Sequence, residues 1–252
     1  MSKFAVILPA AGKSTRFGDK EKKPFVNLDG RAVWLRSAEL FINRDDVCQT
    51  MLVIAPEDQE AFERRFRANI VFMNVQVVLG GAERTDSVAN ALAKLKPEAE
   101  FVAIHDAVRP CLTNEQIDAV FNAARQHGAA MLAAPISDTV KQADAQRKVT
   151  ATMPREGLWL AQTPQVFRRD WLESGYAQRD GVRKPVTDDA QIVEAFNHPV
   201  YLVPGPSTNI KITSRADLIL ADAILKCRPD PKPKGPIHPF AEDEMWGPKP
   251  KR

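Results

Sequence analysis

Residues 4–12 read FAVILPAAG, an apolar run that passes directly into a turn of small residues. A run this short and this apolar is typical of a strand that is buried on both faces. The chain repeats the pattern with further short apolar runs at 51–55, 75–79, 101–105 and 131–134. Such strands need a covering layer on each side, so the sequence predicts a mostly parallel sheet between helices.

Amphipathic stretches lie between and after these runs and predict helices at 32–41, 58–67, 84–95, 115–127, 188–196 and 216–225. Two helix starts carry capping patterns: Thr113 precedes Gln116 by three residues, and Ser214 precedes Asp217 in the same way. Strands that alternate with helices are typical of βαβ units. We therefore predict an α/β fold in three layers.

Residues 136–152 break this rhythm and read ISDTVKQADAQRKVTAT, two β-leaning runs around a polar centre. This pattern predicts a hairpin that reaches away from the sheet. Because a protruding hairpin often packs on a second subunit, we expect a β-arm at about 136–153 that forms a homodimer. A lid over the chain's own site is the alternative.

The composition is that of an ordinary globular protein of 252 residues, with 44% hydrophobic and 27% charged residues. We expect one domain over 1–225. No stretch approaches the roughly 18 apolar residues that a membrane span needs, and the first residues lack a long apolar run with a cleavage site. These observations predict a cytoplasmic protein with no membrane partner. The three cysteines have neither disulfide-framework nor zinc-site spacing, so reduced thiols are expected.

The last 27 residues, 226–252, contain seven of the nineteen prolines, which predicts a disordered tail. They also contain seven basic and four acidic residues, a balance of +3 that equals the net charge of the whole chain. Residues 1–225 are therefore neutral and carry no nucleic-acid signature. Phe240 and Trp246 could anchor a partner, but a solvated extension with two incidental aromatic residues is the expected interpretation.

The loop after the first strand reads PAAGKSTRFGDKEKKPF, and its small residues Ala10, Ala11 and Gly12 let backbone N–H groups approach a ligand. Basic residues crowd the same loop: Lys13, Arg16, Lys20, Lys22 and Lys23. In an open α/β sheet, ligands bind at the carboxyl ends of strands, where this loop would lie. The combination predicts a polyphosphate site.

Two common nucleotide motifs are excluded. The stretch Gly12-Lys13-Ser14-Thr15 imitates the end of a Walker A loop, but Ile7 stands where that motif needs its first glycine. The dinucleotide fingerprint fails as well, because Gly12 and Gly18 stand alone. A P-loop ATPase or a hydride-transfer enzyme is therefore not expected.

A second glycine turn, GGAERTDSV at 80–88, lies between a predicted strand and a predicted helix. Gly80 and Gly81 permit close backbone approach, while Arg84 and Ser87 can hydrogen-bond a flat polar ring or brace the loop. A plain strand-to-helix turn explains the same residues, so this motif alone decides nothing.

The segment His105-Asp106-Ala107-Val108-Arg109-Pro110 follows the apolar run FVAI. A carboxylate just beyond a buried strand suits a metal or a substrate hydroxyl, and Asp106 should stay ionised beside Arg109. His105 ends the apolar run, where a structural histidine is the expected interpretation. Hydroxyls and fixed cations also occur in three later segments, PREGLWLAQTPQ at 154–165, TDD at 187–189 and NIKIT at 209–213.

Taken in order, PAAGKSTRFG, GGAERTDSV, HDAVRP, SDTVK, PREGLWLAQTPQVF, TDDA and TNIKIT resemble the 2-C-methyl-D-erythritol 4-phosphate cytidylyltransferases of non-mevalonate isoprenoid synthesis. The resemblance covers residues 3 to about 226. It implies a Rossmann-like nucleotidyltransferase domain whose β-arm interlocks two subunits. It also implies an enzyme that joins the acceptor phosphate to the α-phosphorus of CTP and releases pyrophosphate, with Mg²⁺ held mainly by the CTP phosphates.

The resemblance further implies residue roles. Ala10, Ala11 and Gly12 would line the nucleotide, and Gly81 and Ser87 would hold its cytosine and ribose. Arg16 and Lys23 would bind the triphosphate. Asp106 would hold the acceptor hydroxyls with help from Thr187, while Thr163 and Lys211 would approach the phosphates. Thr139 and Arg155 would reach the acceptor phosphate from the arm of the neighbouring subunit.

One departure leaves a choice open. The family commonly has Pro-Lys-Gln-aromatic after the first loop, whereas this chain has Lys22-Lys23-Pro24-Phe25. Lys23 has the expected spacing from Phe25, and Lys22 competes with it. A ribitol 5-phosphate cytidylyltransferase shares most of these motifs and is the alternative enzyme, although Lys141 favours the erythritol substrate. A nucleotide-binding module without turnover is the alternative outside the enzymes.

Overall fold

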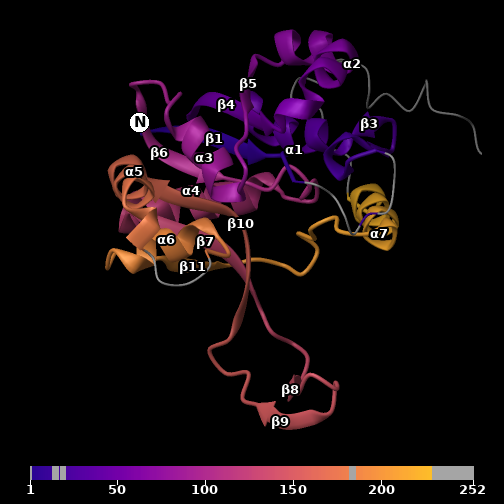
Figure 1. Ribbon diagram of the computed structural model, residues 1–252, viewed down its shortest axis with the longest axis vertical. Coiled ribbons are helices and arrows are strands. Elements are labelled where there is room, and N and C mark those ends of the chain that lie inside the picture. The colour runs from indigo at the N-terminus through magenta and orange to yellow at the C-terminus, as the bar shows by residue number, and fades with distance from the viewer. Residues whose placement is uncertain (1, 13–16, 18–20, 182–185, 229–252) are drawn as a thin grey trace, which may run out of the picture.

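The structure, a computed structural model, describes residues 2–12, 17, 21–181 and 186–228. Seven strands form the central sheet in the order β11-β7-β10-β6-β1-β4-β5 (Figure 1). They are β1 (Lys3–Pro9), β4 (Val47–Ile54), β5 (Val75–Leu79), β6 (Ala99–Ile104), β7 (Ala129–Pro135), β10 (Trp159–Arg168) and β11 (Tyr201–Pro204). Every neighbouring pair is parallel except the two that involve β10. The prediction of a mostly parallel sheet is confirmed.

The strand β1 illustrates why the sheet needs cover on both faces. Phe4, Val6 and Leu8 point into one hydrophobic cluster, while Ile7 points into another. All four side chains are fully buried. Because successive side chains of a strand alternate between faces, an apolar run without alternation must be covered twice.

The helices form the two outer layers. One face of the sheet is covered by α1 (Val33–Ile42), α2 (Gln59–Phe72) and α4 (Asn114–His127). The other face is covered by α3 (Arg84–Leu92), α5 (Arg169–Ala177) and α6 (Asp189–Ala195). The last helix, α7 (Arg215–Lys226), packs outside these layers on a third cluster that includes Phe17 and Ile212. The three-layer α/β fold is therefore as predicted.

Both predicted capping patterns are present. The Thr113 hydroxyl accepts a hydrogen bond from the Gln116 amide and starts α4, and the Ser214 hydroxyl does the same for the Asp217 amide at α7. Three predicted boundaries are wrong by three residues or more. The strand predicted at 51–55 begins at Val47. The helix predicted at 84–95 ends at Leu92, and the helix predicted at 58–67 continues to Phe72.

Three elements, β10, α5 and β11, were not predicted. The strand β10 begins with three exposed residues, Trp159 to Ala161, and its buried part contains Gln162, Thr163 and Gln165, so it lacks the continuous apolar run of the other strands. The strand β11 has four residues, none of them buried. Tertiary pairing with β7, rather than local pattern, makes both segments strands.

The predicted hairpin projects from the body between β7 and β10 (Figure 1). It consists of β8 (Val140–Ala143) and β9 (Val149–Met153), paired antiparallel. The Asp144 carboxylate accepts hydrogen bonds from the amides of Gln146 and Lys148 and so closes the turn. This is the β-arm, and it lies well away from the sheet.

The remaining short elements are η1 (Lys23–Phe25), β2 (Asn27–Leu28), β3 (Arg31–Ala32), η2 (Pro56–Asp58) and η3 (Arg179–Gly181). Within the described ranges, no helix has the length and apolar character needed to cross a bilayer. The tail predicted at 226–252 lies outside the described residues from 229 onward.

Candidate functional site

The candidate site lies at the edge of the sheet where β1, β4, β5 and β6 end, because parallel strands end at a common edge. Backbone hydrogen bonds fix the loops that follow. The Ala10 amide donates to the Val53 carbonyl at 2.7 Å, and the Gly80 amide donates to the Ile54 carbonyl at 2.8 Å. The His105 amide donates to the Ile7 carbonyl at 2.9 Å. Three segments far apart in the sequence therefore start side by side.

The first-strand loop and the glycine turn pack directly on one another. A Cβ built on Gly80 would lie 2.6 Å from the Ser87 Oγ and 2.9 Å from the Ala11 Cβ, so only glycine fits there. The Ser87 hydroxyl accepts from the Gly81 amide at 3.1 Å and donates to the Glu83 carbonyl at 3.1 Å. Of the predicted nucleotide residues, the structure thus brings Ala11, Gly81 and Ser87 together.

The other two predicted nucleotide residues flank this contact. Ala10 is buried beneath the loop, whereas Gly12 is exposed and has open space where a Cβ would stand. Arg16 lies outside the described residues.

The two competing lysines are both in the part of the chain that the structure describes. The Lys22 ammonium forms ion pairs with Asp58 at 2.7 Å and Glu57 at 3.0 Å, at the start of α2. Burial works against its charge, but these two carboxylates raise the pKa of Lys22 above its usual range. Lys22 is therefore committed to the protein's own carboxylates. Lys23 opens η1 and is half-buried.

Asp106 stands at the centre of a cluster of charges beyond β6. Its Oδ2 lies 2.9 Å from the Lys211 Nζ and 3.4 Å from the Arg109 Nε. Burial alone would raise the pKa of this carboxyl, but Lys211, Arg84 and Arg109 together hold it well below its usual range. Asp106 is therefore an anion at neutral pH, and it holds Lys211 at the edge of the site.

A chain of hydrogen bonds links the His105 ring and the Thr163 hydroxyl to the backbone amide of Asp106. The His105 ring is fully buried, with Nε2 3.1 Å from the Arg109 carbonyl and Nδ1 3.1 Å from the Thr163 hydroxyl. A carbonyl can only accept, so Nε2 carries the hydrogen and Nδ1 accepts from the Thr163 hydroxyl. That hydroxyl in turn accepts from the Asp106 amide at 3.1 Å.

The same chain of bonds makes His105 a structural residue. Burial is the main cause that lowers the pKa of His105 to about 4, so the ring is neutral at pH 7. Because both of its nitrogens are occupied, His105 has no open position for base catalysis. The structural interpretation of this histidine agrees with the sequence-based expectation.

Asn209 fixes the loop that carries Lys211. Its side-chain amide donates to the Gln162 Oε1 at 3.1 Å and to the Thr163 carbonyl at 2.9 Å, and the residue is fully buried. Its own carbonyl accepts from the Arg109 guanidinium at 2.6 Å. Sequence reasoning noted the NIKIT segment but assigned no role to Asn209, because an asparagine in a loop usually marks only a turn.

Sequence reasoning missed two ion pairs at the start of α3. One joins α3 to α6, and the other joins α3 to η3. Arg84 pairs with the fully buried Asp189 at 2.6 Å, and the Tyr176 hydroxyl donates to the other oxygen of Asp189 at 2.5 Å. Arg179 pairs with Asp86 at 3.1 Å. Against the effect of burial, Asp189 raises the pKa of Arg84, so the guanidinium is permanently charged. Arg84 braces the loop, one of the two uses that its position allowed.

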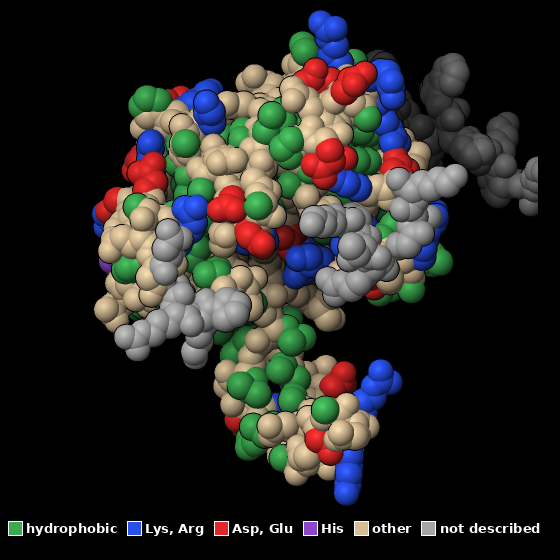
Figure 2. Space-filling view, in the orientation of Figure 1, with side chains coloured by type: hydrophobic (Ala, Val, Ile, Leu, Met, Phe, Trp, Pro, Cys, Tyr) green, Lys and Arg blue, Asp and Glu red, His purple; other side chains and the backbone are tan. Residues whose placement is uncertain are grey.

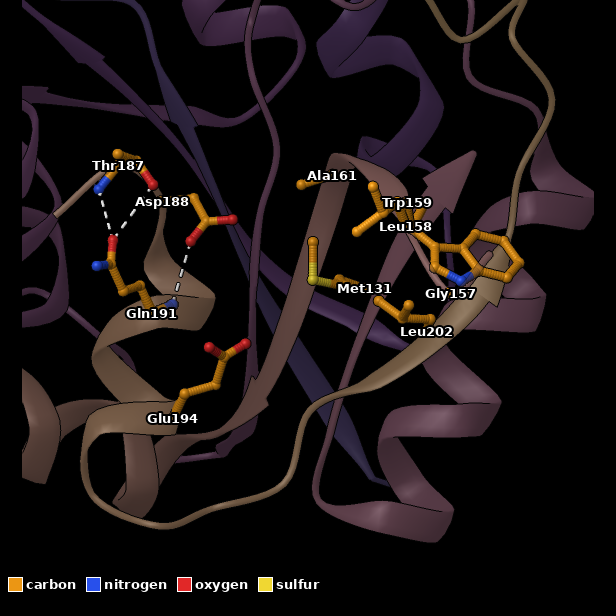
Figure 3. A pocket seen from close by; sticks show the side chains of 11 residues that line it. Met131, Gly157, Leu158, Trp159, Ala161, Thr187, Asp188, Gln191, Glu194 and Leu202 are labelled. Carbon is orange, nitrogen blue, oxygen red and sulfur yellow. Dashed lines mark hydrogen bonds between the residues drawn. The ribbon is translucent and has the colours of Figure 1, made fainter. Parts of the chain in front are cut away.

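Thr187 lies beside a pocket of about 470 Å³ at the start of α6 (Figure 3). Its hydroxyl donates to the Gln191 side chain at 3.2 Å, and Asp188 caps α6 by accepting from the Gln191 amide. Figure 3 shows these polar side chains on one wall, with Trp159 and Leu202 across the cavity. The Gln165 amide donates to Asp188 at 2.8 Å and so ties this wall to the strand that carries Thr163.

The two remaining predicted residues, Thr139 and Arg155, lie on the β-arm and are exposed. The Arg155 guanidinium donates to the Ser137 carbonyl. Among the described residues, no hydrogen bond or ion pair joins Thr139 or Arg155 to Asp106 or Lys211. Within one chain, the structure therefore does not bring the arm residues to the cluster around Asp106.

A metal ion would find few protein ligands here. In the described parts of the chain, no group of three or more histidine, cysteine or acidic side chains is placed to hold one. Asp106, in the loop after β6, is the carboxylate of the charge cluster described above. One carboxylate together with substrate phosphates is a common arrangement for Mg²⁺, so the donor set fits a phosphate-held ion.

Comparison with known proteins gives consistent relatives. A sequence profile of the 2-C-methyl-D-erythritol 4-phosphate cytidylyltransferase family matches residues 4–227. The protein of that name from Rhodopirellula baltica is 40% identical over 236 residues, which cover 89% of this chain and 96% of the relative. The one from Pelotomaculum thermopropionicum is 38% identical, covering 90% of this chain and 96% of the relative.

A solved structure agrees. The 4-diphosphocytidyl-2C-methyl-D-erythritol synthase of Anaerococcus prevotii superimposes with a TM-score of 0.75 at 30% identity. The alignment covers 89% of this chain and 99% of that one. The similarity thus extends over the described fold and stops near the end of α7.

Proposed function

The chain belongs to the 2-C-methyl-D-erythritol 4-phosphate cytidylyltransferase family, and on this premise we propose how its own residues carry out the reaction. The enzyme transfers a cytidylyl group from CTP to 2-C-methyl-D-erythritol 4-phosphate in isoprenoid synthesis. A phosphate oxygen of the acceptor attacks the α-phosphorus of CTP, and the bond to the β,γ-pyrophosphate breaks. The nucleophile needs no general base, because a phosphate monoester has a second pKa of about 6 and is largely dianionic at pH 7.

We assign the nucleotide to the surface formed by the first-strand loop and the glycine turn. Ala10, Ala11 and Gly12 would line it through their backbone, and Gly81 and Ser87 would hold cytosine and ribose. The packing of Gly80 on Ala11 and Ser87 supports this assignment, because it places the first-strand loop directly against the glycine turn.

We assign the triphosphate to Arg16 and Lys23. The pairing of Lys22 with Asp58 and Glu57 supports the choice of Lys23 over its neighbour. Cations in these positions would offset the repulsion between two polyanions and stabilise charge that develops on the leaving pyrophosphate.

We assign the acceptor to Asp106, Thr163, Thr187 and Lys211. The Lys211 ammonium would approach the phosphate, and Asp106 would accept from the polyol hydroxyls. Thr163 would act beside the acceptor mainly by fixing Asp106, since its hydroxyl hydrogen is given to His105. The observation that carries the assignment is the Asp106–Lys211 pair, whose 2.9 Å contact sets a cation and a hydroxyl acceptor side by side.

We propose Mg²⁺ as the divalent cation, held mainly by the CTP phosphates. When bound, such an ion polarises the phosphoryl oxygens and offsets their charge. The small number of protein carboxylates around Asp106 supports a substrate-held ion rather than a protein-built metal centre.

We further propose that two chains share each site, with Thr139 and Arg155 of one arm reaching the acceptor phosphate bound by the partner subunit. Exposed apolar side chains along the neck of the arm support a second chain there (Figure 2): Met153, Leu158, Trp159 and Leu160. Such residues are normally covered, since a contiguous exposed apolar surface marks an interaction site.

The domain limits and location complete the proposal. Residues 1–225 would form the catalytic domain, with 226–252 outside it. A cytoplasmic location is supported by the three free cysteines, because reduced thiols persist in a reducing compartment. Cell fractionation with an antibody to the chain tests the location.

Pyrophosphate release tests the activity directly. With Mg²⁺ and CTP, the wild-type chain should turn over 2-C-methyl-D-erythritol 4-phosphate in preference to ribitol 5-phosphate. Preference for the ribitol substrate would reassign the acceptor, and absence of turnover with either would favour a nucleotide-binding module. Lys23→Ala should lower kcat/KM by about 100-fold or more, roughly 2.7 kcal/mol of transition-state stabilisation, whereas Lys22→Ala should lower it far less.

A further inference from the structure

One face of α2 is apolar and basic and has no partner in the described parts of the chain. Its exposed residues are Arg64, Arg67, Ala68, Val71 and Phe72, here called the α2 patch. The spacing of Arg64, Arg67, Ala68 and Val71 places them on one side of the helix. Phe72 is 92% exposed and Val71 is 76% exposed, which is unusual for apolar side chains of this size.

The patch is a shallow hollow with unpaired positive charge. A cavity of about 660 Å³ is lined by the five patch residues and Arg65. Arg65 pairs with Glu21. Among the described residues, neither Arg64 nor Arg67 makes a hydrogen bond or ion pair, so these two guanidinium groups remain available to an anionic ligand.

The chain itself contains a segment of complementary chemistry. Residues 240–246 read FAEDEMW, with one aromatic residue at each end and three consecutive acidic residues between them. Carboxylates can pair with Arg64 and Arg67, while an aromatic ring can pack on Phe72 and on a guanidinium face. Elsewhere between 226 and 252 the charges are basic apart from Asp230, so this stretch is the acidic part of the tail.

The segment 21–29 runs from the neighbourhood of α2 to that of α7. Figure 1 shows α2 at the top of the body and α7 at its right, with β3 between them. The pKa of Lys226 in the last turn of α7 is raised by its bond to Asp222 and also by Asp29, in the turn after β2. Asp29 is eight residues from Glu21, the partner of Arg65, so the gap between Asp29 and Glu21 is at most about 29 Å.

The tail has a reach comparable with the length of that segment. The described fold ends at Arg228, whose guanidinium donates to the Leu112 and Cys111 carbonyls. Phe240 lies twelve positions after Arg228, and a proline-rich chain of twelve residue steps spans about 37 Å at roughly 3.1 Å per residue. Prolines also restrict the free tail, which reduces the entropy that docking would cost.

We propose that the acidic-aromatic segment 240–246 of this chain docks on the α2 patch of the same chain. The contact would cover Phe72 and Val71, and it would pair Glu242, Asp243 or Glu244 with Arg64 and Arg67. It assigns a use to Phe240 and Trp246 that cytidylyl transfer does not require.

Quenching of Trp246 fluorescence by iodide tests the proposal in the full chain. The Trp246 signal is the difference between the wild-type chain and Trp246→Phe, since three other tryptophans are present. We expect quenching to be about threefold weaker in the wild-type chain than in two variants, Phe72→Ser and the double variant Arg64→Glu with Arg67→Glu. The factor of about three corresponds to roughly two thirds of the wild-type molecules being docked. Ile219→Ser is the matched control, because Ile219 on α7 is 73% exposed and lies off the patch.

A charge-exchange experiment provides the decisive test. Glu242→Arg with Glu244→Arg should expose Trp246, and combining it with the two α2 reversals should restore protection, whereas Lys249→Glu with Lys251→Glu should change little. Equal quenching in all variants overturns the proposal, as does protection that survives the α2 reversals. Protection that grows with protein concentration would assign the patch to the tail of a second copy and also overturn it.

Discussion

Asp106 illustrates how a single residue is set by its surroundings. Its carboxyl is almost fully buried, which by itself favours the neutral form, yet three cations keep it ionised. The anion then orients Lys211 by an ion pair and Arg109 by a longer one. In the proposed acceptor site, the residue would therefore act through the cations that it holds as well as through its own oxygens.

Replacement of Asp106 by asparagine should keep the shape and remove the charge. We expect kcat/KM to fall by about 100-fold or more, roughly 2.7 kcal/mol, because Lys211 loses the partner that orients it. Steady-state pyrophosphate release measures this. Asp222→Asn is the matched control: it breaks an exposed ion pair with Lys226 and should leave kcat/KM unchanged.

His105 predicts a specific loss of stability in mild acid. Its pKa is about 4 in the folded chain and about 6.5 in the unfolded one, so below pH 6.5 the unfolded chain binds more protons. Stability therefore falls as the pH falls from 6.5 towards 4. Between pH 7 and pH 5 this group alone should cost about 2 kcal/mol of unfolding free energy.

Urea unfolding of wild type and His105→Gln at both pH values checks the effect. The variant should be less stable at pH 7 but should lose about 2 kcal/mol less than wild type on going to pH 5. An equal loss in both proteins would mean that other groups cause the acid sensitivity.

At the scale of elements, one ion pair joins α3 to α6 and another joins α3 to η3. The two pairs differ in how deeply they are buried. Asp189 is fully buried and is held by Arg84 and Tyr176, whereas Asp86 and Arg179 are about one-third exposed. Removing one partner of a buried pair leaves an uncompensated charge, while an exposed pair is screened by water.

We therefore expect Asp189→Ala to lower the unfolding free energy by about 3 kcal/mol or more, and Arg179→Ala to lower it by less than about 1 kcal/mol. Urea denaturation at pH 7 compares them. Because both pairs start from the first turn of α3, similar losses would show that burial does not govern their contribution.

At the scale of the whole molecule, the arm predicts activity that depends on two chains. Mixed subunits of Arg155→Ala and Lys23→Ala should form a heterodimer in which one site has both wild-type residues and the other has neither. With random assortment, about half of the dimers are mixed, so about a quarter of wild-type activity should return. Each variant alone, assayed at the same total concentration, is the control.

Sedimentation of the same samples separates two ways in which this could fail. If the chains are dimers and the mixture stays inactive, the two residues do not serve a shared site. If the chain is a monomer at assay concentrations, the exposed neck of the arm is not a dimer surface.

Local pattern was sufficient where a structure is stabilised by neighbours in sequence. The run FAVIL must be a doubly covered strand, because its consecutive apolar residues face both sides of the sheet. The capping residues Thr113 and Ser214 start their helices by bonds that span three residues. The glycines at 80 and 81 were identified for the same reason, since Ser87 and Asp86 are only a few residues away.

Tertiary structure alone decided the contacts between distant segments. No local signal pairs Arg84 with Asp189, and β10 becomes a strand only because β6 and β7 flank it. The ion pairs of Lys22 with the carboxylates at the start of α2 likewise join positions 35 and 36 residues apart. Periodicity and capping act over one or two turns of chain, whereas buried charge pairing depends on which loops the order of strands brings to one edge of the sheet.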